Sequence, residues 1–197
     1  MTIFDELQAA YRDSQDRFRD YARESLEVAH TLAQEFRSYL GAPETYTDPE
    51  DDTRRPYVRL LAFQIQDGVP AAVQPESHLD VLAREEDGFW RFALALILDR
   101  DSQSFPKQSL AFFLRLKVHD DVWHVQLLDD GVQDFQIPET ATASPEKAAL
   151  FGRMVAMVQR LLDAKPWEGV EKLPIGFELH HPNPIEGDAP SPIPAAP

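Results

Sequence analysis

The stretch QSLAFFLRLKVHDDVWHVQLL, residues 108–128, predicts a β-hairpin and with it an antiparallel sheet. Side chains along a strand alternate between its two faces, so every second residue belongs to the same face. One face is apolar and carries Leu110, Phe112, Leu114, Leu116, Val118, Trp123, Val125 and Leu127. A two-residue turn at Asp120-Asp121 would place Lys117 opposite His124 and Arg115 opposite Gln126. The hairpin is therefore expected to bury one face and to present cations on the other.

A group of basic and imidazole side chains, called here the basic strip, consists of Arg91, Arg115, Lys117, His119 and His124. Arg91 belongs to the preceding strand, on the face that does not carry the main apolar set. Together these groups could form a site for a phosphate, a carboxylate or an acidic peptide. The alternative is pairing with the chain's own acids, such as those of the N-terminal helix, because 34 Asp and Glu residues are present. Exposed pairs of that kind stabilise little, typically by under about 1 kcal/mol.

Residues 2–40 contain neither Gly nor Pro, and their apolar side chains recur every three or four positions. This spacing predicts one long amphipathic helix that begins at Thr2 or Asp5 and ends at Gly41. An unbroken helix would span roughly 55 Å, whereas a domain of this size has a radius of gyration of about 16 Å. The helix must therefore cross the domain, break or protrude, and a protruding helix could pair with another copy in a homodimer.

Further elements follow from turn and strand signals. Residues 89–98 predict a central strand because they are apolar on both faces apart from Arg91. Strands are also predicted at 56–66 and, as an edge strand, at 173–179. Two prolines make 69–77 irregular, and residues 78–84 fit a short helix or a strand equally well. A cap and a proline at 144–146 begin a second helix near 145–165.

These elements predict a single α+β domain over residues 1–181. We expect a meander-like antiparallel sheet of four to five strands, packed against the long N-terminal helix and the second helix. Residues 41–55 form an acidic linker in this scheme, and residues 56–181 hold the sheet and the second helix. Residues 182–197, rich in proline, predict a flexible tail that could also be a docking peptide for a proline-reading groove.

The amino-acid composition limits the classes of partner that the chain is expected to bind. A formal net charge of -15 predicts repulsion of nucleic acid and anionic membranes, so general nucleic-acid binding is not expected, whereas a basic protein surface fits. The absence of cysteine excludes disulfides and thiolate chemistry. No apolar run of about 18 residues and no secretory signal occurs, so a cytoplasmic location without membrane association is expected. Arg far outnumbers Lys, which favours a bacterial source.

The chain lacks the common sequence motifs of catalytic and nucleotide-binding sites. The chain has no G-x-G-x-x-G, Walker, G-x-S-x-G or H-E-x-x-H pattern. The element order is similar to the core of PD-(D/E)-x-K nucleases, but Arg115 stands where that family needs an acid. His119, His124 and His180, with an Asp from the hairpin turn, could hold zinc if the last strand lay beside the hairpin. The alternative is exposed polar residues near turns, and neither a metal nor a cofactor is predicted.

By elimination, the sequence favours a non-enzymatic protein that acts through protein–protein contacts, such as an adaptor, an inhibitor or immunity protein, or a chaperone. One alternative is a small-molecule or nucleotide sensor that uses the basic strip. Another is an enzyme with an unfamiliar site, which the three histidines could make metal-dependent.

Overall fold

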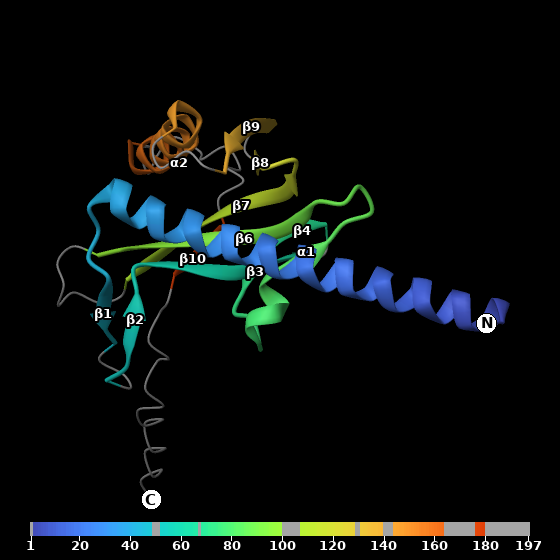
Figure 1. The fold of residues 1–197 in the computed structure, drawn as a ribbon. Coiled ribbons are helices and arrows are strands. Elements are labelled where there is room, and N and C mark those ends of the chain that lie inside the picture. Colours follow the sequence, from blue (N-terminus) through green and yellow to red (C-terminus); the bar gives the residue numbers. More distant parts are fainter. Residues whose placement is uncertain are drawn as a thin grey trace, which may run out of the picture.

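A computed structural model describes residues 2–48, 52–66, 68–99, 107–128, 131–139, 144–163 and 176–179. The fold is α+β, with two long helices against an antiparallel sheet (Figure 1). The helices are α1 (Ile3–Leu40) and α2 (Pro145–Asp163), and the 3-10 helix η1 spans His78–Val81. The strands are β1 (Thr45–Thr47), β2 (Arg54–Pro56), β3 (Val58–Gln66), β4 (Val69–Val73), β5 (Ala83–Arg84), β6 (Trp90–Leu98), β7 (Gln108–His119), β8 (Val122–Leu128), β9 (Val132–Pro138) and β10 (Gly176–Leu179).

The helix α1 is unbroken and protrudes from the sheet. Its start is a capping box in which Thr2 Oγ1 accepts from the Asp5 amide and Asp5 Oδ2 accepts from the Thr2 amide. Its end is Gly41, whose φ of 63° is left-handed. Residues 3–20 are exposed along their whole length, and burial begins only at Tyr21. The first half of the helix therefore extends beyond the sheet, as Figure 1 shows at the end marked N.

The large sheet has the strand order β4-β3-β6-β7-β8-β9, with β10 beside β7 and β5 beside β6. The predicted hairpin is the β7–β8 pair, and its register is confirmed: Lys117 lies opposite His124 and Arg115 opposite Gln126. Asp120 and Asp121 both have positive φ, at 51° and 58°, as a two-residue hairpin turn of the type I′ class requires. β1 and β2 form a separate two-stranded sheet.

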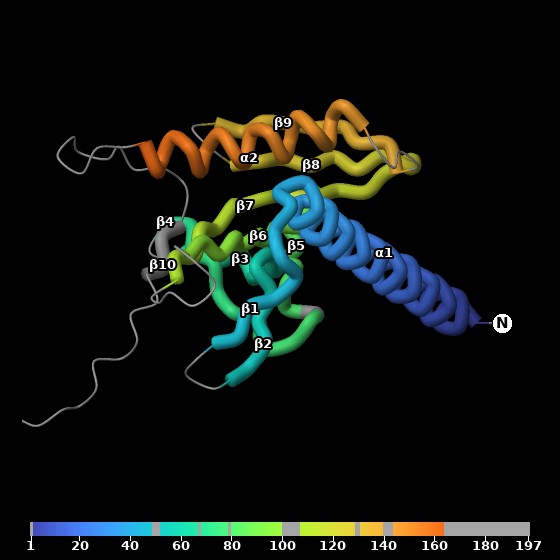
Figure 2. Tube along the Cα trace, turned by 90° about the vertical axis from the view of Figure 1, so that its left-hand side faces the viewer, coloured from blue at the N-terminus to red at the C-terminus, as the bar shows by residue number. Residues whose placement is uncertain are grey.

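The main core lies between one face of the sheet and the two helices. It joins Phe92, Leu94, Phe112, Leu114, Val125, Leu127 and Ile137 of the sheet to Val28, Ala29, Leu32 and Phe36 of α1 and to Leu150, Phe151, Met154 and Met157 of α2. Phe36 is at the centre, with its ring centroid 5.7 Å from that of Phe112 and 5.4 Å from that of Phe151. Figure 2 shows α2 across β8 and β9, and α1 next to it.

The opposite face of the sheet has a smaller core, because β3 changes partners along its length. Residues up to Leu61 pair with β6, and residues from Ala62 pair with β4. The Phe63 ring then lies 4.8 Å from that of Phe113, over the alanines of β6 and β7. The central strand β6 is thus covered on both faces, as its two-sided apolar sequence predicted.

One partly buried ion pair joins the two helices. Lys147 Nζ of α2 lies 2.9 Å from Glu35 Oε1 of α1 and 4.9 Å from the ring centroid of Trp123 on β8. Ser144 caps α2, because its Oγ accepts from the Lys147 amide at 3.0 Å. The aliphatic stem of Lys147 is buried while its charge is neutralised, so both helices are fixed to the same strand.

Three sequence expectations need correction. The sheet is larger than the four to five strands predicted, partly because β9 was not foreseen. The expected linker 41–55 contains β1 and β2. The segment expected to be irregular because of Pro70 forms β4, which is a strand because it lies at the sheet edge, where a missing amide donor costs little. Residues 78–84 contain both η1 and β5.

The tail 182–197 and His180 lie outside the described residues, so neither the docking peptide nor the three-histidine site is tested. The extent of the domain, residues 1–181, stays a prediction. Within the described ranges, no helix combines the length and apolar content needed to span a membrane.

Candidate functional site

The basic strip is brought together in part, and its centre is neutralised by acids of the loop before β6. Arg91 lies opposite Arg115 in the β6–β7 register. Arg115 makes ion pairs with Glu85 and Asp87 and donates to Gln126 Oε1 at 2.8 Å. Arg115 pairs with Glu85 Oε2, and Arg91 Nη1 lies 3.8 Å from Glu85 Oε1. The chain's own acids therefore hold these two guanidinium groups, but they come from this loop and not from the N-terminal helix.

The protonation equilibria agree with this geometry. Burial by itself would lower the pKa of the Arg115 guanidinium, but the hydrogen bonds to Asp87 and Glu85 raise that pKa above its ordinary value. In return, the hydrogen bond from Arg115 lowers the pKa of Asp87. An incoming anion would have to displace two carboxylates from Arg115, which makes a free anion site at this arginine unfavourable.

Among the outer members of the basic strip, Lys117 shares the Phe89 ring with Arg115, and the two histidines lie closer to the hairpin turn than Arg115 does. Lys117 Nζ lies 5.7 Å from the ring centroid of Phe89. His119 Nε2 lies 3.2 Å from Asp120 Oδ2, and both side chains are largely exposed at the hairpin turn. His124 is half-buried and lies opposite Lys117. In the described part of the chain, no three His, Asp or Glu side chains are grouped so as to hold a metal ion.

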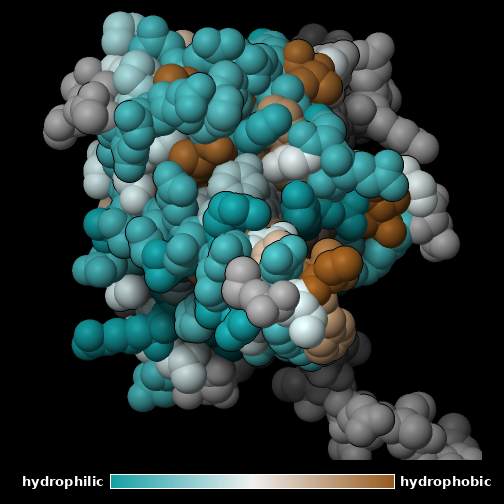
Figure 3. Space-filling view, turned by 45° about the vertical axis from the view of Figure 1, so that its right-hand side comes forward, coloured by the Kyte–Doolittle hydropathy of each residue, from teal (hydrophilic) through white to brown (hydrophobic). Residues whose placement is uncertain are grey.

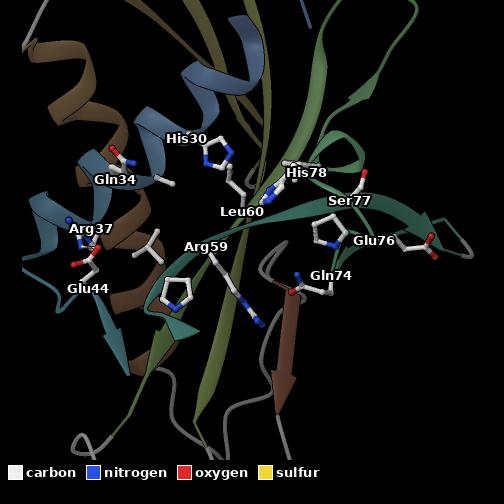
Figure 4. A pocket seen from close by; sticks show the side chains of 15 residues that line it. His30, Gln34, Arg37, Glu44, Arg59, Leu60, Gln74, Glu76, Ser77 and His78 are labelled. Atoms are coloured by element: carbon white, nitrogen blue, oxygen red, sulfur yellow. Dashed lines mark ion pairs between the residues drawn. The ribbon is translucent and has the colours of Figure 1, made fainter. Parts of the chain in front are cut away.

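A hollow that the sequence did not indicate lies between α1, β3 and η1 (Figure 4). Its volume is about 510 Å³, within the range of small-molecule sites. Figure 4 shows His30 of α1 and His78 of η1 above Leu60 of β3, with Arg37 beside Glu44 at the other end. Burial, with the nearby His78 imidazole, lowers the pKa of His30, so His30 is neutral at pH 7. The lining holds two arginines, Arg37 and Arg59, and two acids, Glu44 and Glu76, so the hollow has no strong preference for one charge. Arg37 lies 3.9 Å from Glu44.

A second unforeseen cluster surrounds Tyr57, next to the small β1–β2 sheet. The Tyr57 hydroxyl donates to Asp99 Oδ2 at 2.7 Å, and Asp99 also pairs with the buried Lys107. Lys107 Nζ lies 4.9 Å from the ring centroid of Tyr46. Burial and the Asp99 carboxylate raise the pKa of Tyr57 to about 12. The hydroxyl, carboxylate and ammonium groups are hydrogen-bonded or ion-paired with one another. The cluster therefore stabilises the position of the small β1–β2 sheet.

The projecting half of α1 exposes several large apolar side chains to solvent. The projecting segment, residues 3–20, carries a row of apolar side chains called here the projecting stripe: Phe4, Leu7, Tyr11 and Phe18. Their exposed fractions are 65%, 64%, 66% and 39%. At 100° per residue they lie on the same side of the helix as Ala29 and Phe36, which are fully buried further along. The stripe thus continues the core-facing side of α1 past the edge of the core.

A groove continues the stripe where α1 meets the sheet. Its volume is about 380 Å³, and its lining is mainly apolar: Phe18, Ala22, Leu26, Leu82 and Trp90, with Gln15 and Arg19 at the rim. The Trp90 ring centroid lies 5.8 Å from that of Phe18. Figure 3 shows hydrophobic side chains as separate brown patches on an otherwise mostly hydrophilic surface. An apolar stripe with an adjoining groove is the form of site that binds a helix or another apolar segment.

Comparison with models of known protein families, with curated proteins and with solved structures found no match to this chain. The site assignments therefore depend on the geometry alone. Among the sequence-predicted residues, Arg91 and Arg115 meet in one ion-pair cluster, while His119 is at the exposed turn. The stripe was visible in the sequence only as helical periodicity, which is the same on the covered and the uncovered half.

Proposed function

We propose that this protein acts by binding another protein through the projecting stripe of α1. The supporting observation is the exposure of Phe4, Leu7 and Tyr11 on a capped helix that extends beyond its own core. Several exposed apolar side chains on one side of a helix are unfavourable in water unless a partner covers them. The acidity of the chain, a net charge of -15, favours a basic surface on a partner, whereas residues 3–20 themselves carry both signs, five acids and three arginines, and so also fit a second copy.

The basic strip supports the sensor alternative less well than the sequence suggested. Arg115 and Arg91 already have Glu85 as a common partner, so a nucleotide phosphate would compete with that carboxylate. A ligand-binding function would rest instead on the hollow between His30 and His78, which has the volume for a small molecule. A cytoplasmic location and a bacterial source remain predictions of the sequence.

The test is affinity purification of the tagged full chain from its native host, read by mass spectrometry. It compares the native sequence with Tyr11→Asp and with Asp13→Arg, a control on the outer side of the same helix. We expect the native chain to retain a bound protein that is lost with Tyr11→Asp and kept with Asp13→Arg. A second copy of the chain itself would also meet this expectation. Equal recovery with all three chains would refute the stripe as the contact, and no bound protein together with no self-association would refute protein binding itself.

A further inference from the structure

We infer that the partner seated on the projecting stripe is a second copy of this chain, whose own projecting segment lies antiparallel to the first. This inference rests on the proposed function and names the partner of that site. Four features of the projecting segment support it: the symmetry of its aromatic residues, the mixed signs of its charges, the groove at its inner end, and its length.

The aromatic residues are arranged symmetrically about Tyr11. Phe4 and Phe18 lie seven residues to either side of it, so each is about 10 Å from Tyr11 along the helix axis. In an antiparallel pair with its two-fold axis at Tyr11, Phe4 of each copy meets Phe18 of the other. Leu7 of each copy then falls level with Gln15 of the other and next to Ser14, whose small side chain leaves room for it. In this register Phe4 and Phe18 cover each other, and the two Tyr11 side chains cover each other at the two-fold axis.

The charges of the projecting segment are of both signs. Residues 3–20 carry five acids and three arginines, so the charge of this segment is only -2, although the whole chain has -15. Arg19 also pairs with Asp16 within the same helix. Two such segments therefore repel each other weakly, and a second copy can lie against the stripe.

The groove lies where the end of the second helix would arrive. With the axis at Tyr11, Phe4 of one copy lies level with Phe18 of the other, which lines the groove, and Ala22 follows one turn further along. Phe4, with 65% exposure, would supply the apolar group that enters the groove. A groove with Leu82 and Trp90 on its far wall thus gives the start of the partner helix a contact with the sheet as well as with α1.

The length of the projecting segment matches this overlap. It begins at the cap residue Thr2 and ends at Tyr21, the first half-buried residue of α1. An antiparallel overlap of residues 3–20 therefore brings each helix start as far as the groove at the edge of the other domain. The two domains would lie at opposite ends of a helix pair roughly 27 Å long.

The exposed apolar area of the stripe indicates how tightly two copies would associate. Phe4, Tyr11 and Phe18 together expose about 350 Å² per copy, since one aromatic side chain covers roughly 150–250 Å². Ile3 and Leu7 add to this value. Stable dimers bury about 800 Å² per partner, so the contact is near the low end of specific interfaces. The dimer is expected to form at roughly micromolar concentration and to dissociate on dilution.

The experiment is sedimentation equilibrium of the full chain from roughly 1 to 100 µM, a range centred on that affinity. Tyr11→Asp should raise the dissociation constant at least about tenfold, because the two Tyr11 side chains meet at the two-fold axis and the change places two carboxylates there. Asp13→Arg lies about 160° around the helix axis from Tyr11 and should have no effect. An unchanged dissociation constant with Tyr11→Asp would overturn the inference.

A photo-cross-linking residue at position 4 tests the register. The antiparallel pair predicts adducts with residues 15–26 or 82–90 of the other copy. Adducts with residues 1–8 would mean a parallel pair, and adducts with the same chain's residues 182–197 would mean that the tail covers the stripe; either result overturns the inference. A native chain that is monomeric at every concentration also overturns it. If that monomer still retains a different protein through Tyr11, the proposed function stands without the dimer.

Discussion

Replacement of Phe36 by Ala tests the claim that one half of α1 is anchored and the other half is free. Phe36 is fully buried between Phe112 and Phe151. Phe-to-Ala substitutions in a core typically cost 3–5 kcal/mol, and the two ring contacts place this site near the middle, at about 4 kcal/mol. The matched change is Tyr11→Ala, on the same side of the same helix but 66% exposed, for which we expect a change within about 0.5 kcal/mol.

The assay is urea unfolding of both variants, read by circular dichroism. With a slope of about 2 kcal/mol per molar urea, Phe36→Ala should lower the unfolding midpoint by about 2 M, whereas Tyr11→Ala should leave it almost unchanged. The protein must be dilute, because a dimer contact at Tyr11 would add a concentration-dependent loss. A loss below about 1 kcal/mol for Phe36→Ala, or equal losses for the two variants, would refute the division of the helix.

Three further changes test local features. Gly41→Ala places a side chain at a φ of 63° with open space around it, so the backbone alone should cost about 1 kcal/mol in urea unfolding, whereas Gly131→Ala, also in open space, should cost less. Asp121→Gly relieves a positive φ in the hairpin turn and should raise the unfolding free energy by about 0.5–1 kcal/mol; a loss would contradict the assigned turn. The raised pKa of Tyr57 predicts stability that is complete below pH 10.0 and falls as the pH rises towards about 12, measured as thermal unfolding with tyrosinate absorption. Tyr57→Phe should remove that part of the pH dependence, and an unchanged pH profile would contradict the assignment.

The sequence could predict what depends on local chemistry. The β7–β8 register follows from the alternation of side chains and from Asp120-Asp121, which favour a two-residue turn. The bounds of α1 follow from Thr2 and Gly41, which occupy the expected cap positions. In both cases the decisive residues are neighbours in the chain, so one sequence is sufficient.

What depends on distant pairing could not be predicted. Nothing near Arg115 in sequence shows that Glu85 and Asp87 lie against it, because that contact requires the β5–β6 loop to return over the sheet. The change of partners along β3, which places Phe63 on Phe113, is equally invisible. The two halves of α1 have the same helical spacing, so periodicity could not show that Phe36 is buried and Tyr11 exposed.

The unbroken α1 joins the projecting segment mechanically to the interior. An α-helix is a continuous hydrogen-bonded rod, and a tilt of about 10° at the domain edge would displace the tip by about 5 Å over the roughly 27 Å of residues 3–20. The same rod carries His30 and Arg37 into the hollow and Phe36 into the core. A change in the helix direction caused by binding at Phe4 would therefore also move the α1 wall of that hollow. Binding at the tip and binding in the hollow would both depend on the orientation of this one helix.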